Sequence, residues 1–181
     1  MIDISNELPK HPTMKWKERE EDKITHLIVH CTASNNQDPV KTANYHINSK
    51  ALSKKGAPGI AYHDFITNTG TIYHCNNYNK ITWHAGLYNS YSVGVVIAYL
   101  GEPNLIPNKQ WEFLINHLTE LCLRFKINPS KKLLGHKECI GMFIKMGNGS
   151  VRYYKECPFN IDKLNIMRRE VLCNVSFIGQ K

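Results

Sequence analysis

The sequence predicts one α/β domain in which a central mixed β-sheet is flanked by helices. Its 181 residues are enough for one well-buried domain and short for two. Short β-rich apolar runs alternate with helical patterns, and no internal repeat or low-complexity stretch interrupts them. An apolar content of 42% and a charged content of 21% are ordinary for a globular protein. These observations make a layered domain the expected architecture.

The first elements are predicted in order from the N-terminus. Residues 1–22 are polar and charged and are expected to form a lead-in arm. Residues 24–30 form a β-rich apolar run, which predicts a buried strand ending at a polar loop. Asp38 followed by Pro39 is typical of a helix N-cap with a proline at the first helical position. One face of this short helix is expected to carry Val40, Ala43 and Ile47.

Three further strands are predicted in the middle of the chain. Residues 61–66 and 71–74 are expected to pair, joined by a turn at residues 68–70. Residues 92–100 are nearly all apolar, which indicates a central strand that is covered on both faces.

The second half of the chain contains the clearest helical pattern. Asn108 is the expected cap of a helix that ends before Asn128-Pro129, and a last helix is expected over residues 162–173. The apolar stripe of the first of these helices has i, i+3, i+4 and i+7 spacing. It consists of Trp111, Leu114, Ile115, Leu118, Leu121, Cys122 and Phe125.

Charge and hydropathy limit the classes of partner. The formal net charge of +8 suits an anionic partner such as a teichoic-acid-decorated wall or peptide carboxylates. The basic residues are scattered and form no stripe with interleaved aromatics, so a nucleic acid is not expected as partner. No apolar run approaches the roughly 20 residues that a membrane-spanning helix requires, so no membrane association is expected.

The N-terminus and the cysteines together indicate a reducing compartment. The first seven residues include acids and no apolar stretch of the kind found in secretory signals, so synthesis in a cytoplasm is expected. Under that expectation the six cysteines are reduced thiols, and at least one of them is free to bind a metal.

Three residues stand at positions that suit a catalytic zinc site. Such a site uses three nitrogen or sulfur ligands and leaves a fourth position open to water. Spacing alone identifies nothing among nine histidines and six cysteines, but position is more informative. His30 lies at the end of the first buried strand, His136 follows a short apolar segment, and Cys157 precedes the last helix. Taken alone, each histidine is more commonly a hydrogen-bonded core residue.

Five motifs in order resemble the zinc-dependent N-acetylmuramoyl-L-alanine amidase family, which includes small phage lysozymes and peptidoglycan recognition proteins. Any one of these motifs is weak, but their common order over residues 14–172 is specific. The motifs are Ile28 to Ser34, Ala61 to Ile66 with Gly70 to Ile72, Trp83 to Gly86 with Asn89 and Ser92 to Val95, Gly135 to Glu138, and Lys155 to Pro158.

The resemblance implies a role for each matching residue. His30, His136 and Cys157 would hold one zinc ion per chain. Tyr62 matches the family's catalytic tyrosine, and Lys155 matches a lysine that faces the developing oxyanion in the phage enzymes. The substrate-binding residues would be His84 and Asn89, although His84 would alternatively hydrogen-bond the loop that carries Trp83.

Some positions leave alternatives open. Residues 139–154 form a longer insertion than compact family members have, and the insertion contains Cys139. A His136/Cys139 ligand pair is therefore an alternative, although Cys157 matches the family better. Glu138 would either orient a ligand histidine or be a surface acid. Phe159 stands where many relatives carry a small residue.

The resulting hypothesis is a zinc hydrolase that cleaves the amide bond between N-acetylmuramic acid and L-alanine in bacterial peptidoglycan. Residues 23–175 would form the catalytic domain of a monomer, with residues 176–181 as a C-terminal tail. A phage endolysin that is released from the host cytoplasm onto the cell wall fits best. The alternatives are a muropeptide-recycling amidase of the cytoplasm and a peptidoglycan recognition protein without catalytic activity.

Overall fold

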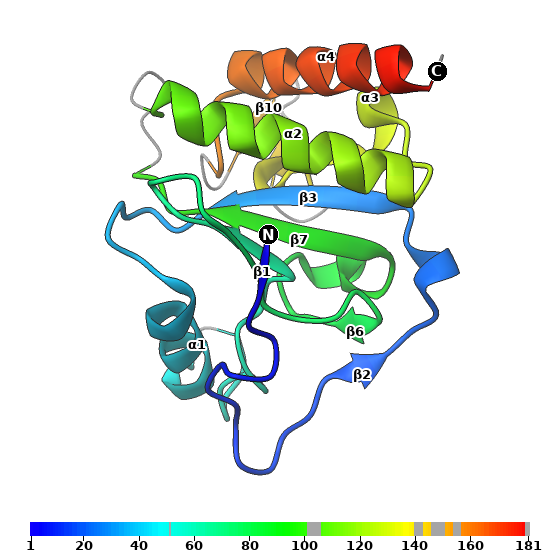
Figure 1. Ribbon diagram of the computed structural model, residues 1–181. Helices are drawn as coiled ribbons and strands as arrows, with labels where there is room; N and C mark the ends of the chain where they lie inside the picture. The colour runs from blue at the N-terminus through cyan, green and yellow to red at the C-terminus, as the bar shows by residue number, and fades with distance from the viewer. Residues whose placement is uncertain (51, 101–105, 140–142, 146–150, 154–156, 180–181) are drawn as a thin grey trace.

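A six-stranded mixed sheet forms the centre of the protein, as a computed structural model shows (Figure 1). The structure describes residues 1–50, 52–100, 106–139, 143–145, 151–153 and 157–179. The strand order is β1-β5-β4-β7-β3-β8, and all neighbours are parallel except the antiparallel pair of β4 and β5. The strands are β1 (Ile2–Asp3), β5 (Ile72–His74), β4 (Asp64–Ile66), β7 (Ser92–Ile97), β3 (His26–Cys31) and β8 (Leu133–Gly135). The predicted α/β class with a mixed sheet is confirmed.

Helices cover both faces of this sheet. In Figure 1, α2 (Asn108–Arg124) and α4 (Ile161–Ile178) lie on one face, and α1 (Pro39–Asn48) lies on the other. Shorter helical segments connect the strands. They are η1 (Glu21–Lys23), η2 (Gly86–Tyr91), α3 (Pro129–Lys132) and η3 (His136–Glu138).

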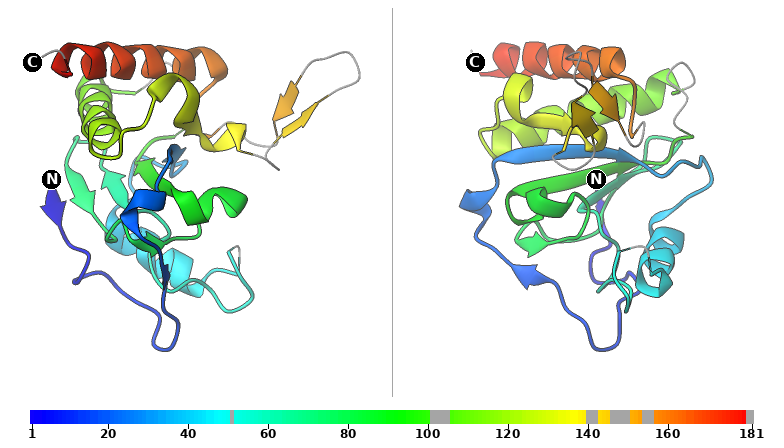
Figure 2. Two further views of the ribbon diagram at one scale, coloured as in Figure 1. Left: turned by 90° about the vertical axis from the view of Figure 1, so that its right-hand side faces the viewer. Right: turned by 180° about the vertical axis from the view of Figure 1, so that it is seen from behind.

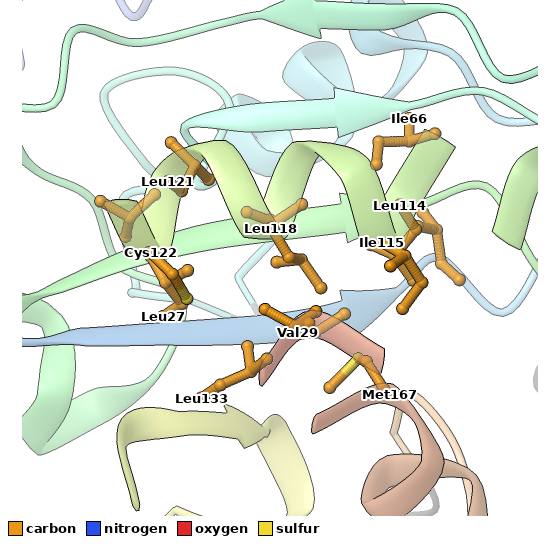
Figure 3. Packing of buried hydrophobic residues seen from close by; sticks show 14 of the residues in the cluster. Leu27, Val29, Ile66, Leu114, Ile115, Leu118, Leu121, Cys122, Leu133 and Met167 are labelled. Carbon is orange, nitrogen blue, oxygen red and sulfur yellow. The ribbon is translucent and has the colours of Figure 1, made fainter. Parts of the chain in front are cut away.

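The period-two alternation of β3 sorts its side chains between the two faces. Leu27 and Val29 are fully buried against α2 and α4, as Figure 3 shows, together with Leu114 and Leu118. Ile28 packs on the opposite side, in a separate cluster with Ala85 and Cys139. His30, two residues after Ile28, therefore belongs to the face away from α2 and α4. The predicted apolar stripe of α2 is confirmed by the burial of most of its members.

Several local predictions need correction. Asn108 does not cap α2 but is its first helical residue, and the preceding residue makes no capping side-chain bond. The buried face of α1 consists of Pro39, Thr42, Ala43 and His46, whereas Val40 is 50% exposed. Asp38 does cap α1, because its Oδ1 accepts the N–H of Lys41 at 2.8 Å.

The strands are shorter than the apolar runs that predicted them. β4 begins at Asp64 rather than residue 61, and β7 ends at Ile97 rather than residue 100. The last helix is longer than predicted, because α4 continues to Ile178 and thus into the expected C-terminal tail.

The N-terminal arm is part of the folded structure. It contributes β1 to the main sheet, and its β2 (Lys17–Glu18) pairs with β6 (Lys80–Ile81). Leu8 of the arm is buried in a further apolar cluster, which includes Ala43 of α1, Phe65 of β4 and Val96 of β7. The described part of the 139–154 insertion is an antiparallel hairpin of β9 (Phe143–Lys145) and β10 (Val151–Tyr153), which extends away from the main sheet in Figure 2. No helix among the described residues is both long and apolar enough to cross a membrane.

Candidate metal centre

Three side chains from distant segments converge at one end of the sheet. One ligand atom each of His30, His136 and Cys157 lies within 4.8 Å of the other two. They form the one group of three or more metal-ligating side chains at this spacing in the described part of the chain. Two nitrogens and one sulfur are a donor set that zinc prefers, and ligand bonds of about 2.0–2.3 Å to a common ion require separations of this order. The residues present therefore fit a tetrahedral zinc site with a fourth position left open.

Strand pairing places the two histidines side by side. Val29 of β3 lies opposite Gly135 of β8 in a parallel ladder, so the next residues, His30 and His136, are neighbours with ring centroids 4.5 Å apart. Gly135 permits this arrangement, because an added Cβ would lie only 2.8 Å from the side chain of Leu164 in α4. A larger residue at this position would push β8 and its histidine away from the helix.

Two backbone hydrogen bonds position Cys157 beside these histidines. The N–H of Lys137 donates to the Cys157 carbonyl at 2.9 Å, and the N–H of Cys31 donates to its Sγ at 3.5 Å. The second bond is one that stabilises a thiolate, the form in which cysteine binds zinc.

The local environment keeps His30 in the form that binds metals. His30 is 1% exposed, and its burial, together with the charge of His136 when protonated, holds its pKa well below the usual range. A neutral imidazole has a free lone pair, and metal ligation requires one.

Glu138 anchors the backbone of this segment. Its Oε2 accepts the N–H of Gly135 at 2.8 Å and pairs with the guanidinium of Arg168 from α4. Arg168 also donates to the carbonyl of Leu133 at 2.8 Å. Of the two sequence-based alternatives, a surface acid is wrong, because this carboxylate is largely buried; it holds the backbone next to His136.

Cys139 is absent from the converging group. Cys139 is 1% exposed and packs against Ile28 and Ala85. Burial, together with the neighbouring charge of Glu138, raises the pKa of its thiol to about 12. Its Sγ lies 4.0 Å from the carbonyl of Gly135. Among the described residues, the geometry thus brings Cys157, not Cys139, to the two histidines.

Tyr62 lies beside the group but outside it. It precedes β4, and its ring centroid is 5.0 Å from that of His30 and 5.4 Å from that of His46 in α1. Burial raises the pKa of its hydroxyl above the usual value. A cavity of 250 Å³ opens next to it, with Cys31, Thr42 and His46 among its lining residues. The cavity adjoins the group through Tyr62 and Cys31, the neighbour of His30 in β3.

His84 and Asn89 make their polar contacts within the protein. His84 is 6% exposed, with its Nδ1 3.1 Å from Nε2 of His30 and its Nε2 3.2 Å from Oγ of Ser92. Asn89 Oδ1 accepts the N–H groups of His84 at 3.0 Å and Ala85 at 2.7 Å. Substrate binding by either residue stays a prediction. The predicted catalytic Lys155 lies outside the described residues.

Arg19 was missed in the sequence, and Ser92 and Gly94 were recognised only as part of a motif, without a role at the site. Ser92 contacts His84, and Gly94 makes space for it, because an added Cβ would lie 2.7 Å from the imidazole. A serine and a glycine inside an otherwise apolar buried strand were the available signal. Arg19 in the arm donates to the carbonyl of Asn89 at 2.7 Å and twice to that of Tyr78. Nothing local in the sequence distinguishes Arg19 from a solvated arginine.

The fold and this group of ligands define the class as an α/β protein with a candidate metal centre, and comparisons with known proteins identify the family. The profile of the N-acetylmuramoyl-L-alanine amidase family matches residues 20–158. A relative, peptidoglycan-recognition protein SC1a of Drosophila melanogaster, is 28% identical, and the match covers 72% of this chain and 75% of the relative.

Two solved structures have the same fold. The Ph2119 endolysin from the Thermus scotoductus MAT2119 bacteriophage Ph2119 has a TM-score of 0.68 at 18% identity, covering 94% of this chain and 97% of that one. Peptidoglycan recognition protein-LE in complex with tracheal cytotoxin has a TM-score of 0.63 at 18% identity, covering 78% and 84%.

Because the family profile matches well over half of the sequence, this chain belongs to the N-acetylmuramoyl-L-alanine amidase family. The resemblance inferred from five motifs is confirmed.

Proposed function

We propose that this protein is a zinc-dependent hydrolase that cleaves the amide bond between N-acetylmuramic acid and L-alanine in bacterial peptidoglycan. The observation that carries the proposal is the convergence of His30, His136 and Cys157 beside Tyr62 and an open cavity, in a chain of the amidase family. A binding protein without catalysis has no need for three metal ligands that leave a fourth position free.

The proposed chemistry combines one metal ion with groups of the chain itself. Zinc held by the three ligands would polarise the amide carbonyl and lower the pKa of a bound water from 15.7 towards ~7. Because burial raises the pKa of Tyr62, its hydroxyl stays protonated near neutral pH, and we assign it the role of orienting the attacking water by a hydrogen bond. By family resemblance, Lys155 would face the oxyanion that develops on the carbonyl.

The decisive experiment measures products and metal together. Digestion of purified peptidoglycan is expected to release new L-alanine amino termini and no new reducing sugar ends. Cys157→Ser should lose both zinc and this activity, whereas the matched variant Cys139→Ser, which removes a buried thiol outside the group, should keep both. New reducing ends without alanine amines would overturn the proposed reaction, and zinc lost in Cys139→Ser but retained in Cys157→Ser would overturn the ligand set.

A non-catalytic recognition function is the second candidate, because a relative and a fold neighbour are named as peptidoglycan recognition proteins. Under this alternative the protein would sediment with insoluble peptidoglycan and release no alanine amines from it, with or without added zinc. Release of those amines by the zinc-loaded protein rejects it.

We further propose the biological setting of a phage endolysin that is made in the cytoplasm and acts on the cell wall after release. The fold similarity to the Ph2119 endolysin supports this setting. Bacteria that express the protein should lyse only after their membrane is permeabilised, and Cys157→Ser should not lyse them. Lysis without permeabilisation would contradict the proposed dependence on release.

A further inference from the structure

We propose that a chain of three hydrogen bonds from His30 to a backbone carbonyl fixes the imidazole tautomer of His30 and leaves its Nδ1 to bind the metal. The chain runs through His84 and Ser92, which we assign as positioning residues. The inference rests on the proposed zinc site but not on the reaction performed there.

The three bonds are continuous and buried. His30 Nε2 lies 3.1 Å from His84 Nδ1, and His84 Nε2 lies 3.2 Å from Ser92 Oγ. The Ser92 hydroxyl donates to the carbonyl of Tyr88 at 2.7 Å. Exposed fractions are 1% for His30, 6% for His84 and 0% for Ser92, so water does not compete for these bonds.

The last acceptor determines the direction of every bond. A carbonyl oxygen only accepts, so the single hydroxyl proton of Ser92 points to Tyr88. Ser92 Oγ then accepts from Nε2–H of His84, and the Nδ1 of neutral His84 is left as an acceptor. His30 must therefore donate through Nε2–H, and the lone pair of the same ring lies on Nδ1.

The partner of His30 in this chain of bonds is a second imidazole. Among the hydrogen bonds of the described residues, none joins His30 or His84 to a carboxylate. Ligand histidines usually donate their second N–H to a carboxylate, a carbonyl or water. Here the partner is a neutral imidazole, so the ligand is oriented without addition of a negative charge to the centre.

The surrounding chain holds His84 against His30. Gly94 leaves room for the ring, because an added Cβ would lie 2.7 Å from Cγ and Nδ1 of His84. Asn89 Oδ1 accepts the N–H groups of His84 and Ala85, and the carbonyl of Asn89 is in turn bound by Arg19 at 2.7 Å. The imidazole is thus fixed from its backbone and from both ring nitrogens.

Nuclear magnetic resonance of the parent protein tests the tautomer directly. In ¹⁵N-labelled protein loaded with ¹¹³Cd, metal–nitrogen coupling is expected at Nδ1 of His30, with a proton retained on Nε2. Coupling at Nε2 of His30 would overturn the proposal. This readout needs no substrate and no variant, so a lack of amidase activity would count against the proposed function alone.

Zinc affinity tests the positioning role. His84→Ala should weaken zinc binding by about 10- to 100-fold, the range found for partners that orient metal ligands. His84→Asn should recover most of this loss, because its Oδ1 can replace Nδ1 as acceptor, and Ser92→Ala should lie between the two. His26→Ala, which removes a half-buried histidine from the same strand, is the control and should bind zinc like the parent. Parent-like affinity in both His84→Ala and Ser92→Ala would overturn the positioning role.

Discussion

Two groups of histidines lie on opposite faces of the same sheet, and they differ in the groups that their ring nitrogens contact. The first group, which we call the metal-side group, consists of His30, His84 and His136. The second, the carboxylate group, consists of His74 and His117 on either side of Asp64. Two consecutive residues show that the groups lie on opposite faces. The ring of His63 packs near His84 of the metal-side group, whereas the next residue, Asp64, is hydrogen-bonded to His117 of α2.

In the carboxylate group the counter-charge comes from the protein. Asp64 is fully buried, with Oδ1 2.7 Å from His74 and Oδ2 2.9 Å from His117 and from the Tyr78 hydroxyl. Burial alone would raise the pKa of Asp64, but hydrogen bonds from both histidines outweigh it and hold the pKa well below its usual range. Burial would likewise lower the pKa of His74, yet the bond to Asp64 raises it above the ordinary value.

For His30 and His84 of the metal-side group, no hydrogen bond to a carboxylate is found among the described residues, and burial lowers the pKa of both. The difference shows that a buried histidine with an internal carboxylate is already neutralised and serves stability. A buried histidine that is kept neutral, as His30 is, still has a lone pair to offer a cation.

The largest expected contrast comes from removing one histidine from each group. His136→Ala should lose stoichiometric zinc and reduce peptidoglycan hydrolysis by several orders of magnitude. His74→Ala should bind one zinc per folded chain. Metal analysis of both purified variants, with circular dichroism to confirm folding, makes the measurement. Loss of zinc from folded His74→Ala would remove the distinction between the groups.

The two tyrosines give a second matched pair. Tyr62→Phe should reduce kcat about 100-fold while leaving zinc content and unfolding free energy unchanged, as expected if its hydroxyl orients the water. Tyr78→Phe should do the reverse, with parent-like kcat and a loss of about 1.5–3 kcal/mol of stability, because its hydroxyl donates to a buried carboxylate. A parent-like kcat for Tyr62→Phe would make that tyrosine structural.

Loss of the buried carboxylate should cost more stability than loss of any exposed charge. Asp64→Asn is expected to lower the free energy of unfolding by about 3–5 kcal/mol, because the histidines on both sides lose their counter-charge. Glu120→Gln is the control, since its side chain is 79% exposed at 3.9 Å from His117, and a change within about 0.5 kcal/mol is expected. Equal effects in urea titrations of the two variants would contradict the assigned role of Asp64.

The smallest predicted effect is a change in the pH dependence of stability. The pKa of His74 is raised on folding, so its contribution is fully present below its unfolded value of about 6.5 and is lost as pH rises through the folded pKa. The pKa of Asp64 is lowered, so its contribution is present above about 3.9 and is lost as pH falls through the folded pKa. The pair therefore stabilises most between these two limits.

Urea titrations of metal-free protein between pH 5 and pH 9 measure this slope. The parent should lose stability above about pH 6.5 more steeply than His74→Asn. An identical slope in the two proteins would show that His74 does not titrate with a raised pKa.

Local chemistry explains which parts of the fold were predictable. The Asp38 cap, the stripe of α2 and the apolar run of β7 depend on residues close in sequence, and each was predicted at or near its observed place. The predicted cap of α2 was wrong, because Asn108 is the first residue of the helix and the residue before it makes no capping side-chain bond. The predicted start of β4 was three residues early, although His63 still shares backbone hydrogen bonds with Gly94 and Cys75.

The candidate site was predictable only where a ligand coincides with an element boundary or a family motif. His30 at the end of a strand and Cys157 before a helix are such positions. The contact of Asp64 with His74 follows from the predicted pairing of residues 61–66 with 71–74 but was not recognised. The contact with His117 could not be predicted, because only the folded structure brings α2 to this strand. The contacts of His84 with His30 and Ser92 depend in the same way on the parallel pairing of β3 and β7.

The guanidinium of Arg19 has a practical consequence for truncated forms of the protein. The family match begins at residue 20, one position after this arginine. A fragment trimmed to that boundary would lose the donor that binds the partly buried carbonyls of Tyr78 and Asn89, and it should be less stable for this reason. A fragment that retains full stability should therefore keep the whole arm, with β1, the buried Leu8, the pairing of β2 with β6, and Arg19.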